Sequence, residues 1–360
     1  MKVALVYDRV NKWGGAERVL LALHELFPQA PLYTSVYHHG RAPWASVFDI
    51  RTSFLQNFPF AKDSHELYPL LMPAAFESFT FADYDLVISV TSEAAKGVIT
   101  KPGTMHICYC LTPTRYLWSG RSEYFSNPIL SFLATPAINY LKKWDLVAAS
   151  RPDHYIAISR EVKARLHNFY RRDSTIIHPP VELYAGIPLK KTAGDYYLVV
   201  SRLVPYKRVD LAIKACNKLG LPLKVVGTGN EEERLREMAG PTVEFIGSIS
   251  DEGLIKLYQH AKALIFPGLE DFGIVMAESL GFGKPVIAFD RGGARDIVED
   301  GRSGILFTSQ NVTALIEAIL RSQKIDFNPK TLRRRAEFFG KDQFKNKFSR
   351  YIKEICKSIK

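Results

Sequence analysis

The stretch Pro267–Ser279, PGLEDFGIVMAES, joins the two elements that decide the fold class. It follows an apolar run, Ala263–Phe266, that predicts a buried strand, and it continues into a helix predicted over Ile274–Leu280. A strand that leads through a polar, glycine-containing loop into a helix is where open α/β sheets bind ligands, and the free amides of the helix start suit an anion such as phosphate. Glu270 in the loop and Glu278 about one turn into the helix offer two carboxylates to one ligand. By itself the stretch fits a surface loop with two solvated acids equally well.

Composition indicates a globular chain of two domains. The chain has 360 residues, of which 47% are apolar and 24% charged. An apolar run of about 18 residues, as a membrane-spanning helix requires, is absent from the sequence. The segment Met1–Asp8 reads as a first strand rather than as a signal peptide, so we expect a cytoplasmic protein.

The net charge of +11 is concentrated at the C-terminal end, where residues 322–360 hold 12 Lys and Arg against 4 Asp and Glu. Within it, residues 341–360 predict a basic amphipathic helix. Its apolar positions form one stripe: Phe344, Phe348, Ile352, Ile355 and Ile359. The helix can dock this stripe on the protein, or it can lie on an anionic membrane surface, and both hold if the basic face contacts lipid headgroups. We expect no nucleic-acid partner.

Strand and helix patterns alternate in both halves of the chain. The first half predicts strands at Val3–Tyr7, Leu32–Val36, Asp85–Val90, His106–Cys110, Tyr155–Ser159 and Thr175–His178. The second half predicts strands at Tyr196–Val200, Leu223–Val226, Val243–Ile246, Ala263–Phe266, Val286–Phe289 and Ile305–Phe307. Such alternation indicates parallel sheets with helices on both faces.

We therefore predict an α/β chain of two Rossmann-like domains whose parallel sheets face each other across a cleft, a common place for ligands. The N-terminal domain covers residues 1–180 and the C-terminal domain residues 195–340. Residues 181–194 form the linker, because Pro, Gly and Lys interrupt both patterns there. The helix at 341–360 is expected to pack back on the N-terminal domain.

Polar loops that open helices mark the candidate site. In the second half they lie at the same predicted sheet edge: Ser201–Arg208, Pro267–Gly273 and Arg291–Ala294. Arg202 and Lys207 can clamp a diphosphate, the first as a fork and the second as a point charge. In the first half, Gly14 and Gly15 allow a ligand to approach the backbone closely. Each loop alone also fits an ordinary turn with solvated charges, but their convergence favours a ligand that contains phosphate.

Three further motifs carry competing interpretations. Gly227-Thr228-Gly229 begins like a dinucleotide fingerprint, but Glu232 replaces the third glycine and would repel a pyrophosphate, which argues against hydride transfer. Asp83 and Asp85 have the spacing of a metal-binding pair and also suit the polar end of a loop before a strand, which we favour. The aromatic segment Arg51–Phe81 fits an acceptor groove, a membrane-facing patch or an apolar cover of the sheet.

Taken together, these residues resemble the family 4 retaining glycosyltransferases, which have the GT-B architecture of two Rossmann-like domains. The motifs that carry the resemblance span nearly the whole chain: Gly14–Arg18, Leu111–Trp118, Ser201–Lys207 and Glu270–Gly273 with Glu278. The run through Trp118, together with Tyr155–Ser159 and His178–Val181, looks most like the mannosyl- and rhamnosyltransferases of bacterial surface polysaccharide assembly. Asp271 stands where glycine is commoner in the family.

The resemblance implies a role for each matching residue. Arg202 and Lys207 would bind the donor diphosphate, Glu270 would hold hydroxyls of the donor sugar, and Glu278 would bind the ribose. We count Glu270, Arg202 and Lys207 as catalytic. The full predicted donor-binding set is Gly14, Gly15, Arg115, Arg202, Lys207, Glu270, Phe272, Gly273, Ile274, Val275 and Glu278.

The implied function is the transfer of a hexose, mannose in our prediction, from a nucleotide sugar such as GDP-mannose. The acceptor would be a glycan growing on a lipid diphosphate at the inner face of the cytoplasmic membrane, and the reaction would need no essential metal or other cofactor. Leu111 departs from the family, because relatives often have His at this position, before the Thr-Pro-x-Arg-Tyr run, and that His is thought to contact the donor sugar. His106, five residues earlier, is not assumed to replace it. The alternatives are a non-catalytic nucleotide-sugar or glycan-binding module, for which Leu111 argues, and an epimerase or phosphorylase of the same architecture.

Overall fold

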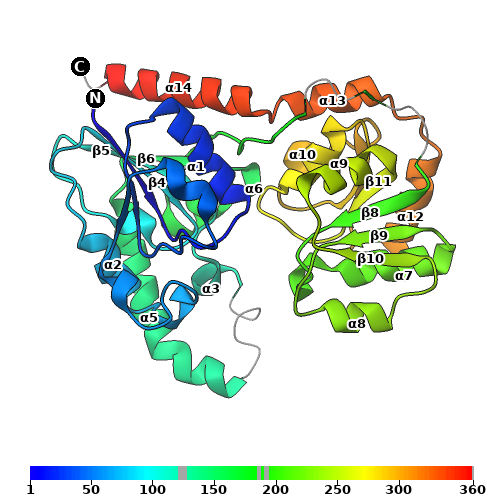
Figure 1. Cartoon of the computed structure of the whole chain (residues 1–360), viewed down its shortest axis with the longest axis horizontal. Helices are drawn as coiled ribbons and strands as arrows, with labels where there is room; N and C mark the ends of the chain where they lie inside the picture. The colour runs from blue at the N-terminus through cyan, green and yellow to red at the C-terminus, as the bar shows by residue number, and fades with distance from the viewer. Residues whose placement is uncertain (121–127, 185–187, 190–193, 359–360) are drawn as a thin grey trace. The chain divides into compact units, whose positions relative to one another are not determined.

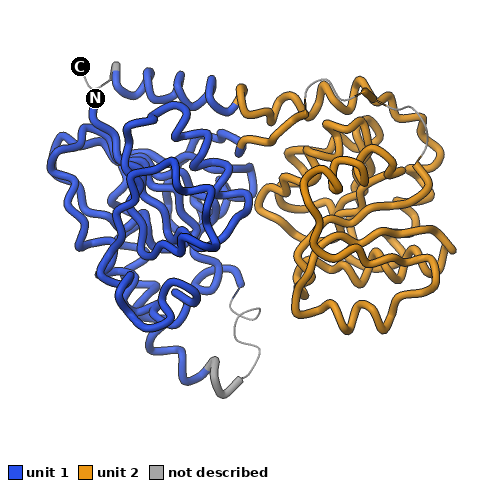
Figure 2. Tube along the Cα trace, in the orientation of Figure 1, with its two compact units in different colours: residues 1–179, 344–360 blue, residues 180–343 orange. Residues whose placement is uncertain are grey.

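The computed structural model describes residues 1–120, 128–184, 188–189 and 194–358, without the side chains of 128–131 and 357–358. The chain divides into two compact units (Figure 2). Unit 1 comprises Met1–Pro179 and Phe344–Lys360, and unit 2 comprises Pro180–Gln343. Both units are α/β, and each contains one parallel sheet.

Unit 1 is built on a seven-stranded sheet with the order β3-β2-β1-β4-β5-β6-β7, of which Figure 1 labels β4, β5 and β6. Its strands are β1 Val3–Tyr7, β2 Leu32–Thr34, β3 Ile50–Thr52, β4 Leu86–Thr91, β5 Met105–Cys110, β6 His154–Ala157 and β7 Thr175–Ile176. Its helices are α1 Gly15–Leu26, α2 Met72–Glu77, α3 Arg115–Trp118, α5 Pro128–Ser150 and α6 Arg160–Arg165, which continues as a π-helix over Leu166–Tyr170. The central strands β1 and β4 are buried along their whole length, as expected for apolar runs covered on both faces.

Unit 2 is built on a six-stranded sheet with the order β10-β9-β8-β11-β12-β13. Its strands are β8 Tyr196–Val200, β9 Leu223–Val226, β10 Val243–Gly247, β11 Ala261–Phe266, β12 Val286–Phe289 and β13 Gly304–Phe307. Its helices are α7 Val209–Leu219, α8 Glu232–Glu237, α9 Asp251–His260, α10 Ile274–Gly281, α11 Ala294–Ile297, α12 Val312–Gln323 and α13 Pro329–Glu337. The predicted fold class, two parallel α/β sheets, is confirmed.

The strand order reverses at one point in each sheet. In unit 1 this point lies between β1 and β4, and in unit 2 it lies between β8 and β11. The loops that leave these strands at their carboxyl ends diverge there, which is where open α/β sheets hold ligands. The candidate ligand-binding loops are therefore those after β1 and β4 in unit 1 and those after β8 and β11 in unit 2.

The C-terminal helix α14, Lys341–Ser358, packs on unit 1 through its apolar stripe, as predicted. The side chains of Phe344 and Phe348 are buried, and both rings contact Tyr109 of β5, with ring centroids 5.9 and 6.4 Å apart. Lys345 forms an ion pair of 2.9 Å with Glu25 of α1, and Figure 1 shows α14 beside α1. Among the described residues, no helix has the length and apolar character needed to cross a membrane.

One strand was absent from the prediction. β3 contains three residues, Ile50–Thr52, of which Arg51 is exposed and the other two are half-buried. The strand is recognisable through its pairing with β2, in which Leu32 lies opposite Ile50. A three-residue strand with an exposed Arg carries too little apolar periodicity to be found from sequence.

Candidate nucleotide-sugar site

The loops after β8 and β11 meet at the switch point of unit 2. Gly268, just after β11, lies against the backbone of Lys207, and a Cβ atom at Gly268 would be 2.9 Å from the Lys207 Cα. Only a residue without a side chain permits this approach. The loop after β8 is therefore fixed on the loop after β11, and the sequence motifs of both loops lie side by side.

Lys207 and Glu270 form an ion pair at this point. Lys207 ends a short 3-10 helix, Pro205–Lys207, and Glu270 lies in the loop between β11 and α10. Their side chains are mostly buried, with 13% and 18% of each exposed. Arg202, from the same loop as Lys207, is exposed and donates to the Tyr206 hydroxyl at 2.8 Å. The structure thus brings Lys207 and Glu270 into contact and places Arg202 in the same loop.

The loop after β12 packs on the loop after β11. The amide of Gly293 donates to the carbonyl of Glu270 at 2.9 Å. Cβ atoms at Gly292 and Gly293 would overlap the backbone carbonyls of Glu270 and Phe272. Gly292 also has a φ of 61°, which favours glycine. The three loops predicted at one sheet edge therefore contact one another through their backbones.

Helix α10 begins at this junction. Gly273 precedes it with a φ of 88°, and Ile274 and Val275 form the first turn, both half-buried. The N–H groups of a first helical turn have no acceptors within the helix and carry its positive dipole end. This end can bind an anion beside Lys207.

Glu278 lies one turn into α10 and is nearly buried. Its exposed fraction is 6%, and it accepts a hydrogen bond of 3.1 Å from the hydroxyl of Tyr258 in α9. Phe272 is also buried, and its ring packs edge-on against Phe339 at 5.6 Å. The side chain of Phe272 is thus a core residue, so any ligand contact at this position comes from its backbone.

The two glycines predicted to border the ligand from the first half of the chain lie where the loop after β1 leads into α1. Gly14 precedes α1 and Gly15 is its first residue. A Cβ atom at Gly14 would be 3.2 Å from the carboxylate of Glu17, which accepts from the Tyr7 hydroxyl at 2.7 Å. Burial, together with Glu17, raises the pKa of Tyr7 well above its usual value. Arg115 begins α3, and its part in donor binding, like that of Gly14 and Gly15, remains a prediction.

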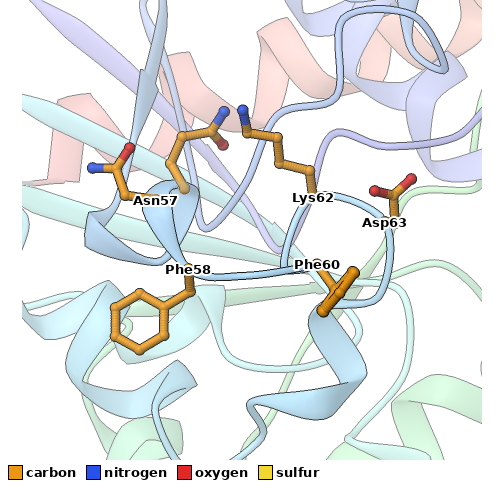
Figure 3. Close-up of a pocket in the computed structure, with 6 residues that line it drawn as sticks. Asn57, Phe58, Phe60, Lys62 and Asp63 are labelled. Atoms are coloured by element: carbon orange, nitrogen blue, oxygen red, sulfur yellow. The ribbon is translucent and has the colours of Figure 1, made fainter.

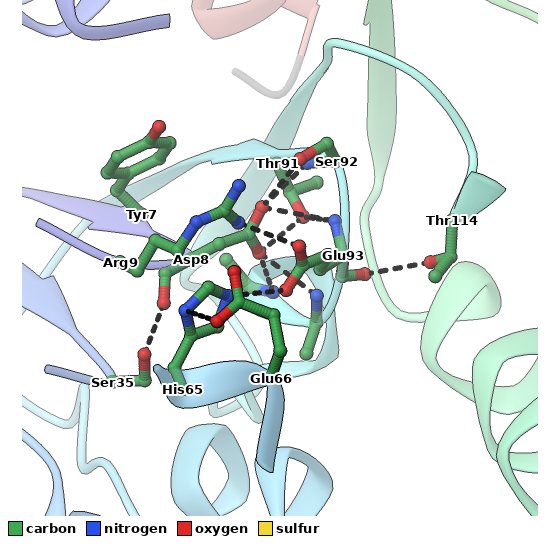
Figure 4. Close-up of polar contacts among 12 residues, drawn as sticks. Tyr7, Asp8, Arg9, Ser35, His65, Glu66, Thr91, Ser92, Glu93 and Thr114 are labelled. Atoms are coloured by element: carbon green, nitrogen blue, oxygen red, sulfur yellow. Dashed lines mark hydrogen bonds and ion pairs between the residues drawn. The ribbon is translucent and has the colours of Figure 1, made fainter. Parts of the chain in front are cut away.

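A buried acidic group at the switch point of unit 1 was missed from sequence. Asp8 follows β1 directly, and its carboxylate accepts from the backbone amides of Ser92, Glu93, Ala94 and Ala95 after β4 and from the Thr91 hydroxyl, at 2.7 to 3.0 Å (Figure 4). Burial, and to a lesser degree Glu93, raises the pKa of Asp8. The sequence pattern that could have identified Asp8 is an Asp placed directly after a predicted buried strand.

Glu93 pairs with two basic side chains in the same network. Its carboxylate contacts Arg9 at 2.7 Å and the His65 ring at 3.5 Å (Figure 4). Burial alone would raise the pKa of Glu93, but Arg9 and His65 outweigh it and lower the pKa to about 2. Because these residues are far apart in sequence, only the fold shows that they meet.

The segment Leu111–Trp118 is anchored by one buried carboxylate, that of Asp145 in α5. Asp145 accepts hydrogen bonds from the side chains of Thr114, Trp118 and Tyr170 at 3.1, 2.7 and 2.6 Å. It also forms a 2.6 Å ion pair with Lys96, and both side chains are almost fully buried. Burial opposes the charge on Lys96, but Asp145 raises its pKa.

Leu111 and His106 occupy different environments. Leu111 is half-buried after β5, and its amide donates to the carbonyl of Thr91 at 2.8 Å. His106 is fully buried within β5, 2.9 Å from the Ser89 hydroxyl, and burial together with Arg151 lowers its pKa to about 3. His106 is therefore a neutral core residue.

Comparison with known proteins relates part of this chain to one protein family. Residues 183–337 match the family described as Glycosyl transferases group 1. An uncharacterized glycosyltransferase of Methanocaldococcus jannaschii is 29% identical over 56% of this chain and 57% of its own length. The O-antigen chain mannosyltransferase C of Escherichia coli is 28% identical over 50% of this chain and 51% of its own length. The chain thus aligns with about half the length of these relatives.

Solved structures extend the similarity to the whole fold. The Anabaena protein HepE, solved in complex with UDP, superposes with a TM-score of 0.72 at 19% identity and covers 98% of this chain and 100% of its own. Sucrose-phosphate synthase from Thermosynechococcus elongatus superposes with a TM-score of 0.71 at 16% identity, covering 99% of this chain and 100% of its own. Residues 183–337, which make up most of unit 2, thus match the group 1 glycosyltransferase family, and the whole chain has the fold of these solved structures.

Proposed function

We propose that this protein is a retaining glycosyltransferase that transfers a hexose from a nucleotide sugar to a glycan acceptor in surface polysaccharide biosynthesis. The observation that carries the proposal is the Lys207–Glu270 ion pair beside the start of α10, at the switch point of the unit 2 sheet. A cation, a carboxylate and free helix amides in one place match the two kinds of group at the reacting end of a nucleotide sugar: the cation and the amides match the diphosphate, and the carboxylate matches the sugar hydroxyls.

Donor binding would rearrange the ion pair. A diphosphate carries more negative charge than Glu270, so it would draw the Lys207 ammonium toward its own oxygens. Glu270 would then be free to accept hydrogen bonds from hydroxyls of the donor sugar. The amides of Gly273, Ile274 and Val275 would face the phosphates and Arg202 would add a second cation. Glu278, oriented by Tyr258, would receive the ribose hydroxyls.

The chemistry follows from charge. As the bond to the anomeric carbon breaks, the diphosphate gains negative charge and the carbon gains positive charge. Fixed cations and amides aimed at the diphosphate stabilise this charge, and single donors of this kind are worth about 10²–10³ in rate. The departing phosphate would accept the proton of the acceptor hydroxyl, so attack would occur on the same face and the configuration would be retained.

Mannose is the proposed sugar, and GDP-mannose the proposed donor. Two relatives support mannose: the E. coli O-antigen chain mannosyltransferase C, and the phosphatidyl-myo-inositol mannosyltransferase of Mycobacterium leprae, which is 36% identical over 27% of this chain. UDP-glucose is the competing donor, since HepE was also solved in complex with UDP-glucose. The acceptor is proposed to be lipid-linked, in keeping with the mannosyltransferase resemblance.

The donor is tested by thermal shift with GDP-mannose, UDP-glucose, ADP-glucose and dTDP-rhamnose, because a ligand that binds the folded chain raises its melting temperature. GDP-mannose is expected to give the largest rise. Transfer is then followed with radiolabelled donor and a polyprenyl-diphosphate oligosaccharide. A donor that binds without transfer or hydrolysis under any of these conditions would favour the non-catalytic binding module, for which Leu111 is the sequence argument.

Membrane contact is proposed for the outer face of α14. Its apolar stripe is buried on unit 1 from Phe344 to Ile355, and Ile359 lies outside the described residues, whereas Arg350 and Lys353 are exposed. Each Lys or Arg near an anionic surface contributes about 1 kcal/mol. Lys353→Glu is therefore expected to weaken binding of the full chain to phosphatidylglycerol vesicles at least about fivefold. Lys218→Glu, the same charge change at an exposed position of α7, is the control. Equal binding by both variants would exclude α14 as the contact.

A further inference from the structure

A shallow pocket of about 400 Å³ lies in unit 1 on the segment that follows β3, but its side chains do not converge on one point. Its lining residues are Gln56, Asn57, Phe58, Phe60, Lys62 and Asp63. Figure 3 shows the Phe60 ring on one side of the loop and the side chains of Lys62 and Asp63 on the other. Phe60 is 75% exposed, and the Gln56 amide is occupied by the backbone of Tyr37. The pocket thus lacks the gathered partners that distinguish a carboxylate of unit 2, described next.

Glu278 is a charged residue in a helix that is otherwise suited to the core. Its neighbours in α10, Met276, Ala277, Ser279 and Leu280, are all buried, and Glu278 itself is 6% exposed. A carboxylate loses much of its hydration at such a position, so an apolar residue would serve the packing better. The charge at this position therefore indicates a task other than folding.

The carboxylate of Glu278 is directed by a hydroxyl from the neighbouring helix α9. The Tyr258 hydroxyl lies 3.1 Å from Oε2 of Glu278 and 3.4 Å from the carbonyl of Val275, both in α10. A hydroxyl has one proton, and the charged carboxylate, which is also the closer acceptor, takes it in preference. Because the hydroxyl is neutral, it orients the carboxylate without cancelling its charge. A carboxylate accepts several hydrogen bonds, so it can still receive the hydroxyls of a ligand.

The ring of Tyr258 is itself fixed by packing. It is 1% exposed and stacks on the ring of Phe282, with centroids 5.1 Å apart and an interplanar angle of 12°. Phe282 follows the last residue of α10 and stacks in turn on Tyr184, at 5.7 Å and 29°. The carbonyl of Leu257, next to Tyr258 in α9, accepts a hydrogen bond of 2.9 Å from the hydroxyl of Tyr196 in β8. The hydroxyl of the stacked ring is thus held at one place, as a preorganised site requires.

We propose that Tyr258 is a positioning residue that makes the donor site selective for ribonucleotides. Glu278, held by Tyr258, would accept hydrogen bonds from the ribose hydroxyls, and a deoxyribose would leave the carboxylate covered by the ligand without that partner. This selectivity rests on the proposed function and narrows its donor class. Sugars carried on GDP, UDP or ADP fit the site, whereas sugars carried on dTDP, which lacks the 2′-hydroxyl, do not.

A purely structural pair is the competing explanation, since any buried carboxylate needs a hydrogen bond. In that case, loss of the Tyr258 hydroxyl would weaken the binding of every nucleotide by the same factor. In a positioning role, the same loss would weaken only the nucleotides that carry the 2′-hydroxyl. The ratio of two dissociation constants therefore separates the two roles.

The test measures dissociation constants of the full chain by calorimetry for GDP, UDP and ADP, each paired with its 2′-deoxy form. In the pair whose ribose form binds most tightly, the wild type should bind the deoxy form at least about tenfold more weakly. Tyr258→Phe keeps the stacked ring and should reduce this ratio to about threefold or less, by weakening the ribose form. Glu278→Ala should abolish the preference. Tyr196→Phe, which removes the hydroxyl that contacts α9 from β8, is the matched control and should keep the wild-type ratio.

Both Tyr→Phe variants keep the ring and its volume, so both should fold, which melting temperatures check. Equal weakening of both forms in Tyr258→Phe, or an unchanged ratio, would overturn the positioning role. A wild type that binds both forms alike would overturn the selectivity and leave the proposed transferase standing. Failure of all three ribonucleotides to bind would overturn the selectivity and the proposed function together. A Tyr258-dependent ratio in a chain that never transfers a sugar would reject the transferase and retain the ribonucleotide site.

Discussion

The ligand-side edges of the two sheets are stabilised in different ways, although both sheets reverse their strand order after the same number of strands. In unit 2, glycines such as Gly268 and Gly293 bring the loop backbones into direct contact. In unit 1, buried charges join the loops: Asp8 accepts five short hydrogen bonds, one from the last residue of β4 and four from the segment after it, and Asp145 pairs with Lys96.

This difference between the two edges separates the side chains expected to act on a ligand from those that stabilise the fold. Because the unit 2 loops are held by backbone contacts, the side chains of Lys207 and Glu270 remain available to a ligand. In unit 1, Asp8, Asp145 and Lys96 have their hydrogen-bonding capacity directed to the protein itself. Substitution of a charged side chain at the edge of unit 2 is thus expected to lower activity. Substitution of a buried charged side chain in unit 1 is expected to lower the free energy of unfolding.

The largest expected effect is on the stability of unit 1. Asp145→Asn leaves the buried Lys96 ammonium without its counter-charge, and removal of one partner of a buried pair costs about 3–5 kcal/mol. Urea unfolding followed by tryptophan fluorescence measures the change. Glu354→Gln, which breaks the exposed 3.9 Å pair with Arg350, is the control and should cost less than about 1 kcal/mol.

The double variant Lys96→Met with Asp145→Asn sharpens this prediction. It removes the uncompensated charge, so it should recover part of the stability lost in Asp145→Asn. A double variant that is as unstable as the sum of both single changes would show that the charges do not interact.

The next effect is on activity in unit 2. Lys207→Ala removes the cation that faces the proposed diphosphate, so kcat/KM should fall by about 10²–10³. The melting temperature should fall less than in Asp145→Asn, since 18% of the Glu270 side chain is exposed to water and the loops are held by backbone contacts. Lys214→Ala, which removes an exposed Lys from a 3.6 Å pair with Asp210 in the same unit, should retain activity. Comparable activity of the two variants would remove Lys207 from the site.

A smaller effect is expected from the glycine contacts. Gly293→Ala forces a Cβ atom into the Phe272 backbone, so the loops must separate, at a cost of about 1–3 kcal/mol, and donor thermal shifts should diminish. Gly301→Ala is the comparison: its Cβ would meet nothing within 4 Å, but its φ of 76° costs about 1–2 kcal/mol. Loss of donor binding in Gly301→Ala as well would show that instability, rather than the loop contact, is responsible.

The smallest effect is a dependence of stability on pH that involves Glu93. Its pKa is lowered to about 2 in the folded chain, from 4.5 without these neighbours. A lowered carboxyl pKa stabilises the folded state above pH 4.5, and this contribution is lost as the pH falls from 4.5 toward 2. Glu93→Gln should therefore reduce the slope of stability against pH in the accessible part of that range, measured by urea unfolding between pH 3 and 6. An unchanged slope would contradict the Arg9–Glu93 interaction.

The parallel α/β fold could be predicted because its signals are local. All six strands predicted in the second half are present, from β8 at Tyr196–Val200 to β13 at Gly304–Phe307, since each is a short apolar run bounded by turn residues. The docking of the C-terminal helix was predicted from the spacing of Phe344 and Phe348 within one stripe. In contrast, β3 was missed because only its pairing with β2 makes it a strand.

The candidate site could be predicted in part. Glu270 and Lys207 were chosen from their loops, and the structure brings them into contact. Their roles, and those of Arg202, Gly273 and Glu278, remain predictions. The burial of Phe272 and the network around Asp8 and Asp145 were not predicted, because each depends on partners distant in sequence.

The sequence by itself determined the periodicity of strands and helices, the glycine-containing loops that follow the strands and the stripe of the C-terminal helix. These are properties of residues that are neighbours in sequence, so a short stretch of the chain is enough to recognise them. Only the tertiary structure decided which charges meet. Whether Lys96 is a solvated Lys or the buried partner of Asp145, and whether Phe60 is a core ring or an exposed one, depends on the packing of segments far apart in the chain, since burial and electrostatic pairing arise from that packing.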